Sequence, residues 1–419
     1  MSNTTGGTSS DKHEGINPRL LFLASCIALI ATAMSFAIRG DIMGDFEGVF
    51  GLSKTNVGWI AGAAFWGFGL SIFIGGPLCD ALGMGNIIRL AAAGHIGGAL
   101  LTIFAPNFAV LFAATLIVGI ANGLIEAACN PLIATIYPEQ KTQKLTLFHA
   151  WFPGGIVIGG LLCVALNQTT AFGQGSAWGW KVKMALLLIP AVIYTAMILG
   201  QKFPATERKA AGVPFLEMFR EAVSRPLFIV IWLMMWLTAA TELGPGQWIA
   251  NIYNEVMGST KGAGILLLVW GSGLMWALRQ FVSGIAHKFT PISLIAFTAP
   301  FAFVGLLLCN VATTPLTWFV ASGLLYFGVC FWWPTMLGIA SERFPKTGAF
   351  GLAFIGGTGS ISTAVAGPVM GWINDTWGAN RVLPIWSALP VVLCIVFTVI
   401  YLGDRAKGGY RIERIGQQT

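Results

Sequence analysis

An acidic residue, Glu126, interrupts a long apolar run that extends from about residue 108 to residue 137. A carboxylate at mid-membrane depth costs roughly 3 kcal/mol on insertion scales, so acids in such runs usually have a function. Asn130 lies four residues later on the same helical face, and Pro131 leaves the carbonyl of Ala127 without its helical partner. These groups predict a polar site inside the membrane. An acid desolvated there could load and release protons near neutral pH.

Two charged residues near the end of the first apolar run could share this work. Asp41 is expected to carry a coupling proton together with Glu126, whereas Asp45 and Glu47 should lie at the outer surface. Arg39 stays charged at any relevant pH and therefore needs a partner. It either holds a deprotonated carboxylate, such as Glu126, or binds an anionic substrate.

Further polar side chains could bind hydroxyl groups of a substrate. Glu242 precedes Gly244-Pro245-Gly246, which we expect to break its helix, and discontinuous helices often line membrane sites. The alternative is a gating hinge that touches no substrate. Gln247 and Asn251, one turn apart, are the neighbouring candidates.

Aromatic and basic side chains complete the candidate set. Flat sugar faces stack on indole rings, although tryptophans also anchor helices at the membrane interface. Candidates for stacking are Trp270, Trp276, Trp332 and, most strongly, Trp333. Arg279 could reach the interface in a structural role, and His149 could shuttle a proton or simply pack. His95 has no polar neighbours in its own run and is discounted.

The composition places all of these residues in a membrane protein. Of 419 residues, 56% are hydrophobic and 10% charged, whereas soluble domains carry about 25% charged residues. Twelve apolar runs are each long enough to cross a ~30 Å hydrocarbon layer as a helix. Their approximate limits are 19–43, 56–78, 87–105, 108–137, 146–166, 183–201, 226–253, 262–285, 291–310, 315–340, 348–373 and 382–403. The predicted fold is therefore all-α, with twelve transmembrane helices.

The basic residues predict the orientation. Of the 24 Lys and Arg residues, 17 fall on the same side as the termini and five on the opposite loops, Lys183 among them. By the positive-inside rule, both termini are cytoplasmic in a plasma membrane or bacterial inner membrane. The sequence has no GKS or GKT tripeptide, no enzymatic constellation and no paired cysteines. We expect no enzyme activity, no metal and no cofactor beyond a coupling proton.

The chain divides into two similar halves. Pro131 aligns with Pro334, and Phe152-Pro-Gly-Gly155 aligns with Phe354-Ile-Gly-Gly357. Such repeats are typical of transporters whose halves rock about a central site. The predicted parts are a disordered tail (1–18), a six-helix bundle (19–201), a linker with an amphipathic surface helix at 215–223 (202–225), a second bundle (226–403) and a tail (404–419).

Two segments resemble known families. Gly76-Pro-Leu-Cys-Asp80-Ala-Leu-Gly83 resembles the G-x-L-x-D-x-x-G signature of the major facilitator superfamily, with Arg89 in place of the usual basic pair. This resemblance implies that Asp80 caps a neighbouring helix and gates the cytoplasmic side, unless the segment is a plain turn. Glu126-Ala-Ala-Cys-Asn130-Pro131 resembles a segment of the fucose–proton symporter family, whose first span also carries an acid, as Asp41 does here.

The resulting prediction is a monomeric secondary active transporter with its cavity between spans one, four, seven and ten. The resemblance implies proton-coupled uptake of a sugar or polyol, in which release of the proton restores an Arg39–carboxylate contact. The first alternative is uptake of an organic anion, such as a sugar acid, clamped by Arg39 and Arg279. A proton-driven exporter and a membrane sensor are weaker alternatives. The expected partners are a small molecule and lipid, not nucleic acid.

Overall fold

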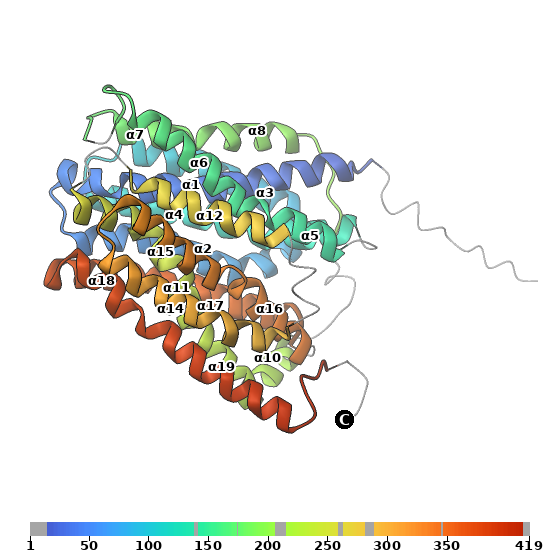
Figure 1. Ribbon diagram of the computed structural model, residues 1–419. Helices are drawn as coiled ribbons and strands as arrows, with labels where there is room; N and C mark the ends of the chain where they lie inside the picture. The colour runs from blue at the N-terminus through green and yellow to red at the C-terminus, as the bar shows by residue number, and fades with distance from the viewer. Residues whose placement is uncertain are drawn as a thin grey trace, which may run out of the picture.

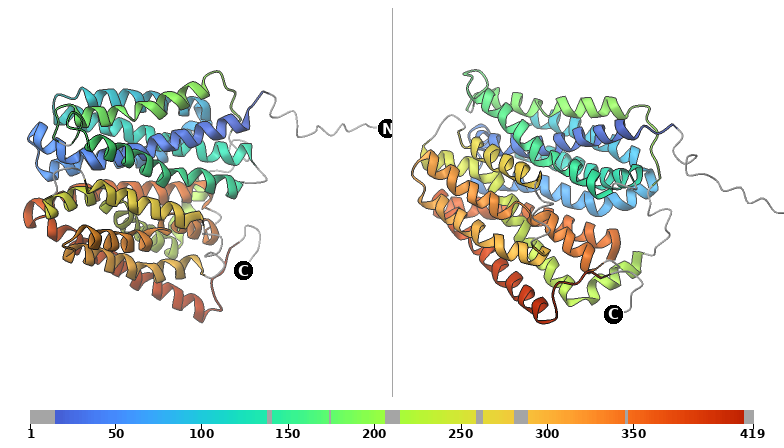
Figure 2. Two further views of the ribbon diagram at one scale, coloured as in Figure 1. Left: turned by 45° about the horizontal axis from the view of Figure 1, so that its top comes forward. Right: turned by 45° about the vertical axis from the view of Figure 1, so that its right-hand side comes forward.

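The computed structural model describes residues 15–137, 141–173, 175–205, 215–258, 263–280, 289–344 and 347–413. These residues form helices joined by short connections, in two halves that lie side by side (Figures 1 and 2). Within this part of the chain, ten helices are long and apolar enough to cross a membrane, and Ile265–Arg279 forms a shorter apolar helix. The predicted all-α membrane fold is confirmed.

The N-terminal half begins with helices whose starts are encoded locally. The side chains of Asn17, Ser53 and Asn107 each accept a backbone N–H in the first turn of α1, α2 and α4. Two predicted spans each consist of two successive helices. The helices are α1 (Pro18–Phe50), α2 (Lys54–Leu82), α3 (Met84–Ile103), α4 (Phe108–Ile136), α5 (Lys141–His149), α6 (Trp151–Asn167), α7 (Gly179–Ala185) and α8 (Leu188–Ile198).

The C-terminal half follows a short helix, α10 (Phe215–Ser224), which matches the predicted helix in the linker. Residues 206–214 of that linker lie outside the described part of the chain. The remaining helices are α11 (Pro226–Met257), α12 (Ile265–Gln280), α14 (Pro291–Val311), α15 (Pro315–Val329), α16 (Trp332–Arg343), α17 (Gly348–Trp377), α18 (Ala379–Trp386) and α19 (Ala388–Ala406).

The expected break in the seventh span is wrong. Helix α11 runs unbroken through Gly244-Pro245-Gly246. Pro245 removes only one backbone hydrogen bond, and the indole of Trp386 donates to the nearby carbonyl of Ala240 at 3.0 Å. The break lies instead in the tenth span, at Cys330–Phe331 between α15 and α16.

The two halves meet closely along α2 and α17. A Cβ atom added to Gly62 would lie 2.3 Å from the carbonyl oxygen of Ala364, and one added to Gly58 would lie 2.5 Å from that of Gly367. Only glycine allows two helix backbones to approach this closely. These glycines therefore determine how near the halves can come.

One set of polar contacts joins the halves at one end. The carboxylate of Asp375 on α17 accepts the backbone N–H groups of Lys54 (3.2 Å) and Thr55 (2.8 Å), at the N-terminus of α2. An anion is stabilised there by the helix dipole. The ammonium group of Lys54 pairs with Glu255 of α11. The described chain begins (residue 15) and ends (residue 413) on the opposite side, toward which α19 slopes away from α1 (Figure 1).

We expect Gly62→Val to disrupt the contact between the halves. The added side chain would overlap the α17 backbone, and overpacking of this kind costs about 1–3 kcal/mol. The variant should show a lower melting temperature in detergent, by several degrees. Gly97→Val is the matched control, because a Cβ at Gly97 on α3 meets nothing within 4 Å. Equal losses in both variants would contradict this role.

Candidate functional site

Arg39 lies where the two halves meet. It is 5% exposed on α1, and its Nε donates to the amide oxygen of Gln247 on α11 at 3.1 Å. Its Nη2 is buried without a hydrogen-bond partner among the described residues. The expected Glu126 or other carboxylate is not the partner found here. A neutral amide bridges the halves instead, so the guanidinium charge remains uncompensated by this contact.

Two aromatic rings lie against this guanidinium. Its Cζ lies 4.8 Å from the ring centroid of Phe36 and 5.7 Å from that of Phe65, distances typical of cation–π contacts. The ring of Phe152 lies 5.6 Å from that of Phe36. Leu243 of the other half packs against this aromatic cluster. The arrangement offers a positive charge beside an apolar, aromatic surface.

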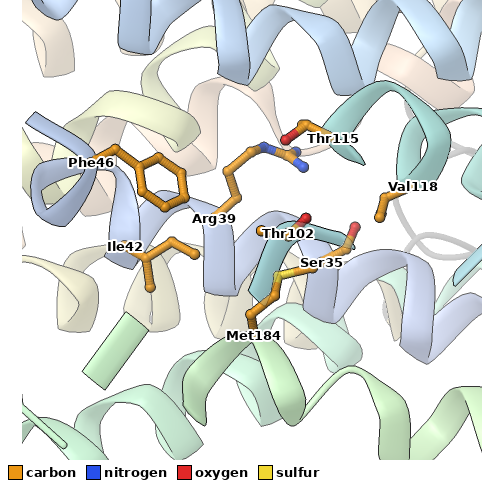
Figure 3. A pocket seen from close by; sticks show the side chains of 8 residues that line it. All are labelled: Ser35, Arg39, Ile42, Phe46, Thr102, Thr115, Val118 and Met184. Atoms are coloured by element: carbon orange, nitrogen blue, oxygen red, sulfur yellow. The ribbon is translucent and has the colours of Figure 1, made fainter. Parts of the chain in front are cut away.

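A small cavity of about 20 Å³ adjoins Arg39 (Figure 3). The hydroxyls of Thr102 and Thr115 donate to carbonyls of their own helices, so they face the cavity as acceptors. Such a space holds about one water molecule and no organic substrate. The site at Arg39 is therefore closed in this conformation. The lining residues are Ser35, Arg39, Ile42, Phe46, Thr102, Thr115, Val118 and Met184.

Asp41 is neutralised inside the N-terminal half. Its Oδ2 lies 2.6 Å from the ammonium group of Lys183, and both side chains are fully buried. The amide of Asn167 donates to Oδ1 at 3.0 Å. The assignment of Lys183 to an outer loop is wrong, because α7 carries this residue into the protein interior. The sequence does not reveal this pair, since its members are far apart along the chain.

The expected surface position of Asp45 is also wrong. Its residue exposure is 9%, and its Oδ1 accepts the backbone N–H of Gly175 at 2.8 Å. Helix α1 continues to Phe50, beyond the predicted end of the first span, which carries Asp45 into contact with the connection before α7. Glu47, in contrast, is partly exposed and lies 3.6 Å from Lys54.

Glu126, Asn130 and His149 form a hydrogen-bonded chain. The Asn130 amide donates to the Glu126 carboxylate at 2.9 Å, as the helical spacing predicts, and its oxygen contacts His149 Nε2 at 3.0 Å. His149 Nε2 must be the donor because the amide oxygen can only accept. All three residues are partly exposed. The carbonyl of Ala127, freed by Pro131, contacts the Cys79 thiol at 3.7 Å and is not part of this chain.

Glu242 and Arg279 form an ion pair in the C-terminal half. Arg279 Nη2 lies 3.3 Å from Glu242 Oε1, and Arg279 Nε donates to the carbonyl of Cys330 at 3.1 Å. The backbone N–H of Trp333 donates to Glu242 Oε2 at 3.0 Å. Glu242 and Arg279, both candidate site residues, thus meet at the break between α15 and α16.

The four candidate tryptophans do not form one stacking surface. Trp332 is fully buried, and its indole donates to Thr298 at 2.8 Å, so no ring face is available in this conformation. Trp270 and Trp276 are six residues apart on α12, so they point about 120° apart. Trp270 donates to the carbonyl of Phe319, and Trp276 lies against Gly154 of α6. Trp333 is partly exposed and remains available.

Asn251, the last candidate on α11, contacts the other half. Its amide donates to the carbonyl of Gly40 at 3.2 Å. Gly40 directly follows Arg39, so Gln247 and Asn251 together hold one turn of α1 against α11. In this conformation both amides join the two halves. Their predicted role, the binding of substrate hydroxyls, stays a prediction.

His95 belongs to a polar chain that the sequence analysis missed. Its Nδ1 lies 2.9 Å from the Tyr194 hydroxyl and its Nε2 lies 2.8 Å from the Asn122 oxygen. The Asn122 amide in turn donates to Ser35 at 3.0 Å, so the chain joins four helices. The expectation that His95 has no polar company is wrong. A buried histidine and a buried asparagine in separate apolar runs were the signal that could have suggested it.

The predicted gating segment covers the end of α2, the single connecting residue Gly83 and the start of α3. Gly83 has a φ angle of +83°, a conformation that favours glycine. Arg89 donates to Asn86 at 2.8 Å and to the carbonyl of Gln201 at 3.5 Å. A side chain at Gly76 would meet nothing within 4 Å. The side chain of Asp80 lies outside the described part of the structure, so its gating role stays a prediction.

Comparison with known proteins gives consistent results. A family model described as Major Facilitator Superfamily matches residues 20–346. A gallate transporter of Pseudomonas putida is 26% identical over 90% of this chain and 70% of its own length. A gentisate transporter of Corynebacterium glutamicum is 24% identical over 70% of this chain and 67% of its own.

The fold is similar to that of solved transporters. The xylose transporter of Escherichia coli, in a partially occluded inward-open conformation, superposes with a TM-score of 0.74 at 11% identity. The match covers 91% of this chain and 99% of that one. At this identity the likeness concerns the fold alone.

Proposed function

The chain belongs to the major facilitator superfamily, and we propose that it imports an organic carboxylate together with protons by alternating access. One observation supports this most: Arg39 is buried between the halves, and its Nη2 has no partner among the described residues. A guanidinium matches the geometry of a carboxylate and cannot lose its charge at relevant pH. When the halves separate, this group becomes the anchor for an anionic substrate.

The surroundings of Arg39 favour a carboxylate with an aromatic body. Phe36 and Phe65 lie beside the guanidinium, and Phe152 packs on Phe36. Rings of this kind stack on other rings in offset or edge-to-face arrangements. Gallate and gentisate, the substrates in the names of two similar transporters, are both carboxylates on an aromatic ring. These relatives support the same substrate class for this chain.

Accumulation of an anion inside the cell requires a co-transported ion that supplies the free energy. With both termini in the cytoplasm, as the basic residues predict, the anion moves against the inside-negative potential at about 2.3 kcal/mol per charge per 100 mV. One or more protons carried in the same direction offset this cost. Asp41 is held by Lys183, whereas Glu126 is partly exposed and bonded to the neutral Asn130. Glu126 is therefore the better acid for exchanging protons with the side of the termini.

A transport panel tests this function. Purified protein in lipid vesicles should accumulate radiolabelled gallate or gentisate when the outside is acidic, and should do so at least about tenfold less without a pH gradient. D-Xylose and L-fucose serve as neutral comparisons. Uptake of the neutral sugars alone would contradict the carboxylate proposal.

Glu126→Gln should separate exchange from accumulation. The amide keeps the hydrogen-bonding shape of the side chain but cannot carry a proton. We expect counterflow exchange of gentisate to persist within about threefold, while accumulation driven by a pH gradient is lost. Normal accumulation by this variant would rule out Glu126 as the acid that exchanges protons.

A neutral sugar is the second candidate substrate. The partly exposed chain of Glu126, Asn130 and His149 offers acceptors and donors for hydroxyls, and Trp333 offers a ring face. Uptake of a sugar is also what the resemblance to the fucose–proton symporter family implies. The same panel distinguishes it, because it compares uptake of the neutral sugars directly with uptake of the aromatic carboxylates.

A further inference from the structure

A chain of buried polar side chains ends one helical turn from Arg39. The hydroxyl of Tyr194 on α8, the ring of His95 on α3 and the amide of Asn122 on α4 follow one another at 2.9 and 2.8 Å. The Asn122 amide then donates to Ser35 on α1 at 3.0 Å. All four side chains are buried. Ser35 precedes Arg39 by four residues, so the chain reaches the turn of α1 that carries the guanidinium.

The hydrogen bonds of this chain run in one direction. The oxygen of Asn122 only accepts, so His95 Nε2 is the donor, and Nδ1 of the neutral ring accepts the hydroxyl hydrogen of Tyr194. Ser35 accepts from Asn122, and its own hydroxyl donates to the carbonyl of Thr32 at 2.7 Å. Each link therefore has one donor and one acceptor, and no link requires a charged group.

Apolar packing is incomplete on this face of α1. Ser35 and Arg39 both line the cavity of about 20 Å³, which Thr102 of α3 and Thr115 of α4 also line (Figure 3). Protein interiors contain few voids of this size. A hydrogen bond restrains its partners in angle as well as in distance. The bond from Asn122 to Ser35 is therefore a stronger constraint on this turn than the contacts around the cavity.

The position of Arg39 has to be narrow for its proposed work. Its Nε donates to Gln247 of the other half at 3.1 Å. A guanidinium binds a carboxylate through a planar fork, so its orientation matters as much as its charge. A group that binds a ligand must be held within about 0.5 Å of its productive position by the side chains behind it. Fully satisfied buried polar networks supply this rigidity.

We propose that His95 and Asn122 are positioning residues for Arg39. They do not contact the substrate. Through Ser35 they hold the turn of α1 so that the guanidinium points toward the other half in the orientation that a carboxylate requires. This inference rests on the proposed binding of a carboxylate to Arg39, and it leaves the coupling proton on Glu126.

Equilibrium binding of gentisate to the purified protein tests the positioning. Asn122→Leu removes the amide and leaves His95 Nε2 without its acceptor, so the dissociation constant should rise about tenfold. The same substitution in an Arg39→Lys protein should change the constant less than about twofold, because an ammonium group has no planar fork to orient. An equal rise in both proteins would show that Asn122 acts independently of Arg39 and would overturn the proposal.

Substitutions of His95 separate hydrogen bonding from proton transfer. Glutamine offers an N–H donor and an oxygen acceptor but takes up no proton at relevant pH. His95→Gln should therefore keep the dissociation constant within about threefold and keep accumulation driven by a pH gradient, whereas His95→Leu should raise the constant about tenfold. A His95→Gln protein that binds as weakly as His95→Leu, or one that binds normally but no longer accumulates gentisate, would overturn the proposal.

Two further variants address loss of stability. Thr358→Val is the matched control, because Thr358 is buried in the C-terminal half and accepts the indole N–H of Trp232 at 2.9 Å. It should melt at a lower temperature but bind gentisate within about twofold of the unmodified protein. Ser35→Ala covers the case in which Asn122→Leu does not fold. It removes only the last link and should raise the dissociation constant about threefold, and an unchanged constant would overturn the proposal.

A measurement without substrate separates this inference from the proposed function. If the unmodified protein binds neither gentisate nor gallate, the proposed function fails. NMR of isotope-labelled arginine still reports on Arg39 through its Nε–H signal, which is assigned by its loss in Arg39→Lys. Hydrogen exchange of this group should be at least about fivefold faster in Asn122→Leu, because its bond to Gln247 opens more often, and unchanged in Thr358→Val. Equal exchange rates in Asn122→Leu and the unmodified protein would overturn the positioning role.

Discussion

Replacing Arg39 with glutamine should abolish concentrative uptake of gallate and gentisate. Glutamine can still approach Gln247, but it has no charge with which to hold a carboxylate. Removing one partner of a buried, hydrogen-bonded charge pair costs about 2–5 kcal/mol, and each 1.4 kcal/mol is about tenfold in affinity. The apparent affinity for the carboxylate should therefore fall at least about 30-fold in vesicle uptake assays.

Two further variants sharpen this test. Arg39→Lys keeps the charge but loses the planar fork that matches a carboxylate, so it should retain weak uptake. Arg381→Gln removes a positive charge from an exposed position on α18 and should transport normally. If Arg39→Gln still accumulates carboxylates as the unmodified protein does, Arg39 is not the anchor and the proposed substrate class loses its main support.

Replacing Lys183 with methionine should destabilise the N-terminal half severely. Lys183 is the ion-pair partner of Asp41, and neither side chain reaches solvent. Breaking a buried pair by removing one partner costs about 3–5 kcal/mol, because the remaining charge has no compensation. The variant should show a large fall in melting temperature in detergent and reduced yield from membranes.

The double variant identifies the cause. Lys183→Met combined with Asp41→Asn removes both charges and keeps the contact between Asn167 and residue 41 possible, so stability should largely return. Lys181→Met is the matched control, because Lys181 is a neighbouring lysine whose ammonium group lies over the rings of Trp178 and Trp180. If Lys183→Met melts at the temperature of the unmodified protein, the buried pair is not a support of this half.

Several features of the site could be predicted from local spacing. Asn130 meets Glu126 because residues four apart share a helical face, and Asn17, Ser53 and Asn107 begin helices by capping them. The predicted helix break at Gly244-Pro245-Gly246 is wrong for a physical reason as well. Glycine and proline weaken a helix, but packing of α11 against its neighbours outweighs that local preference.

Composition and periodicity were enough to determine a helical membrane protein with two similar halves, because hydrocarbon demands long apolar helices whatever their packing. The partner of each buried charge could not be determined in this way. Arg39 and its partner Gln247 are 208 residues apart in the sequence, and Asp41 and its partner Lys183 lie on different helices. Only the tertiary structure brings such groups together, because a charge in a membrane is compensated by what lies beside it in space and not along the chain.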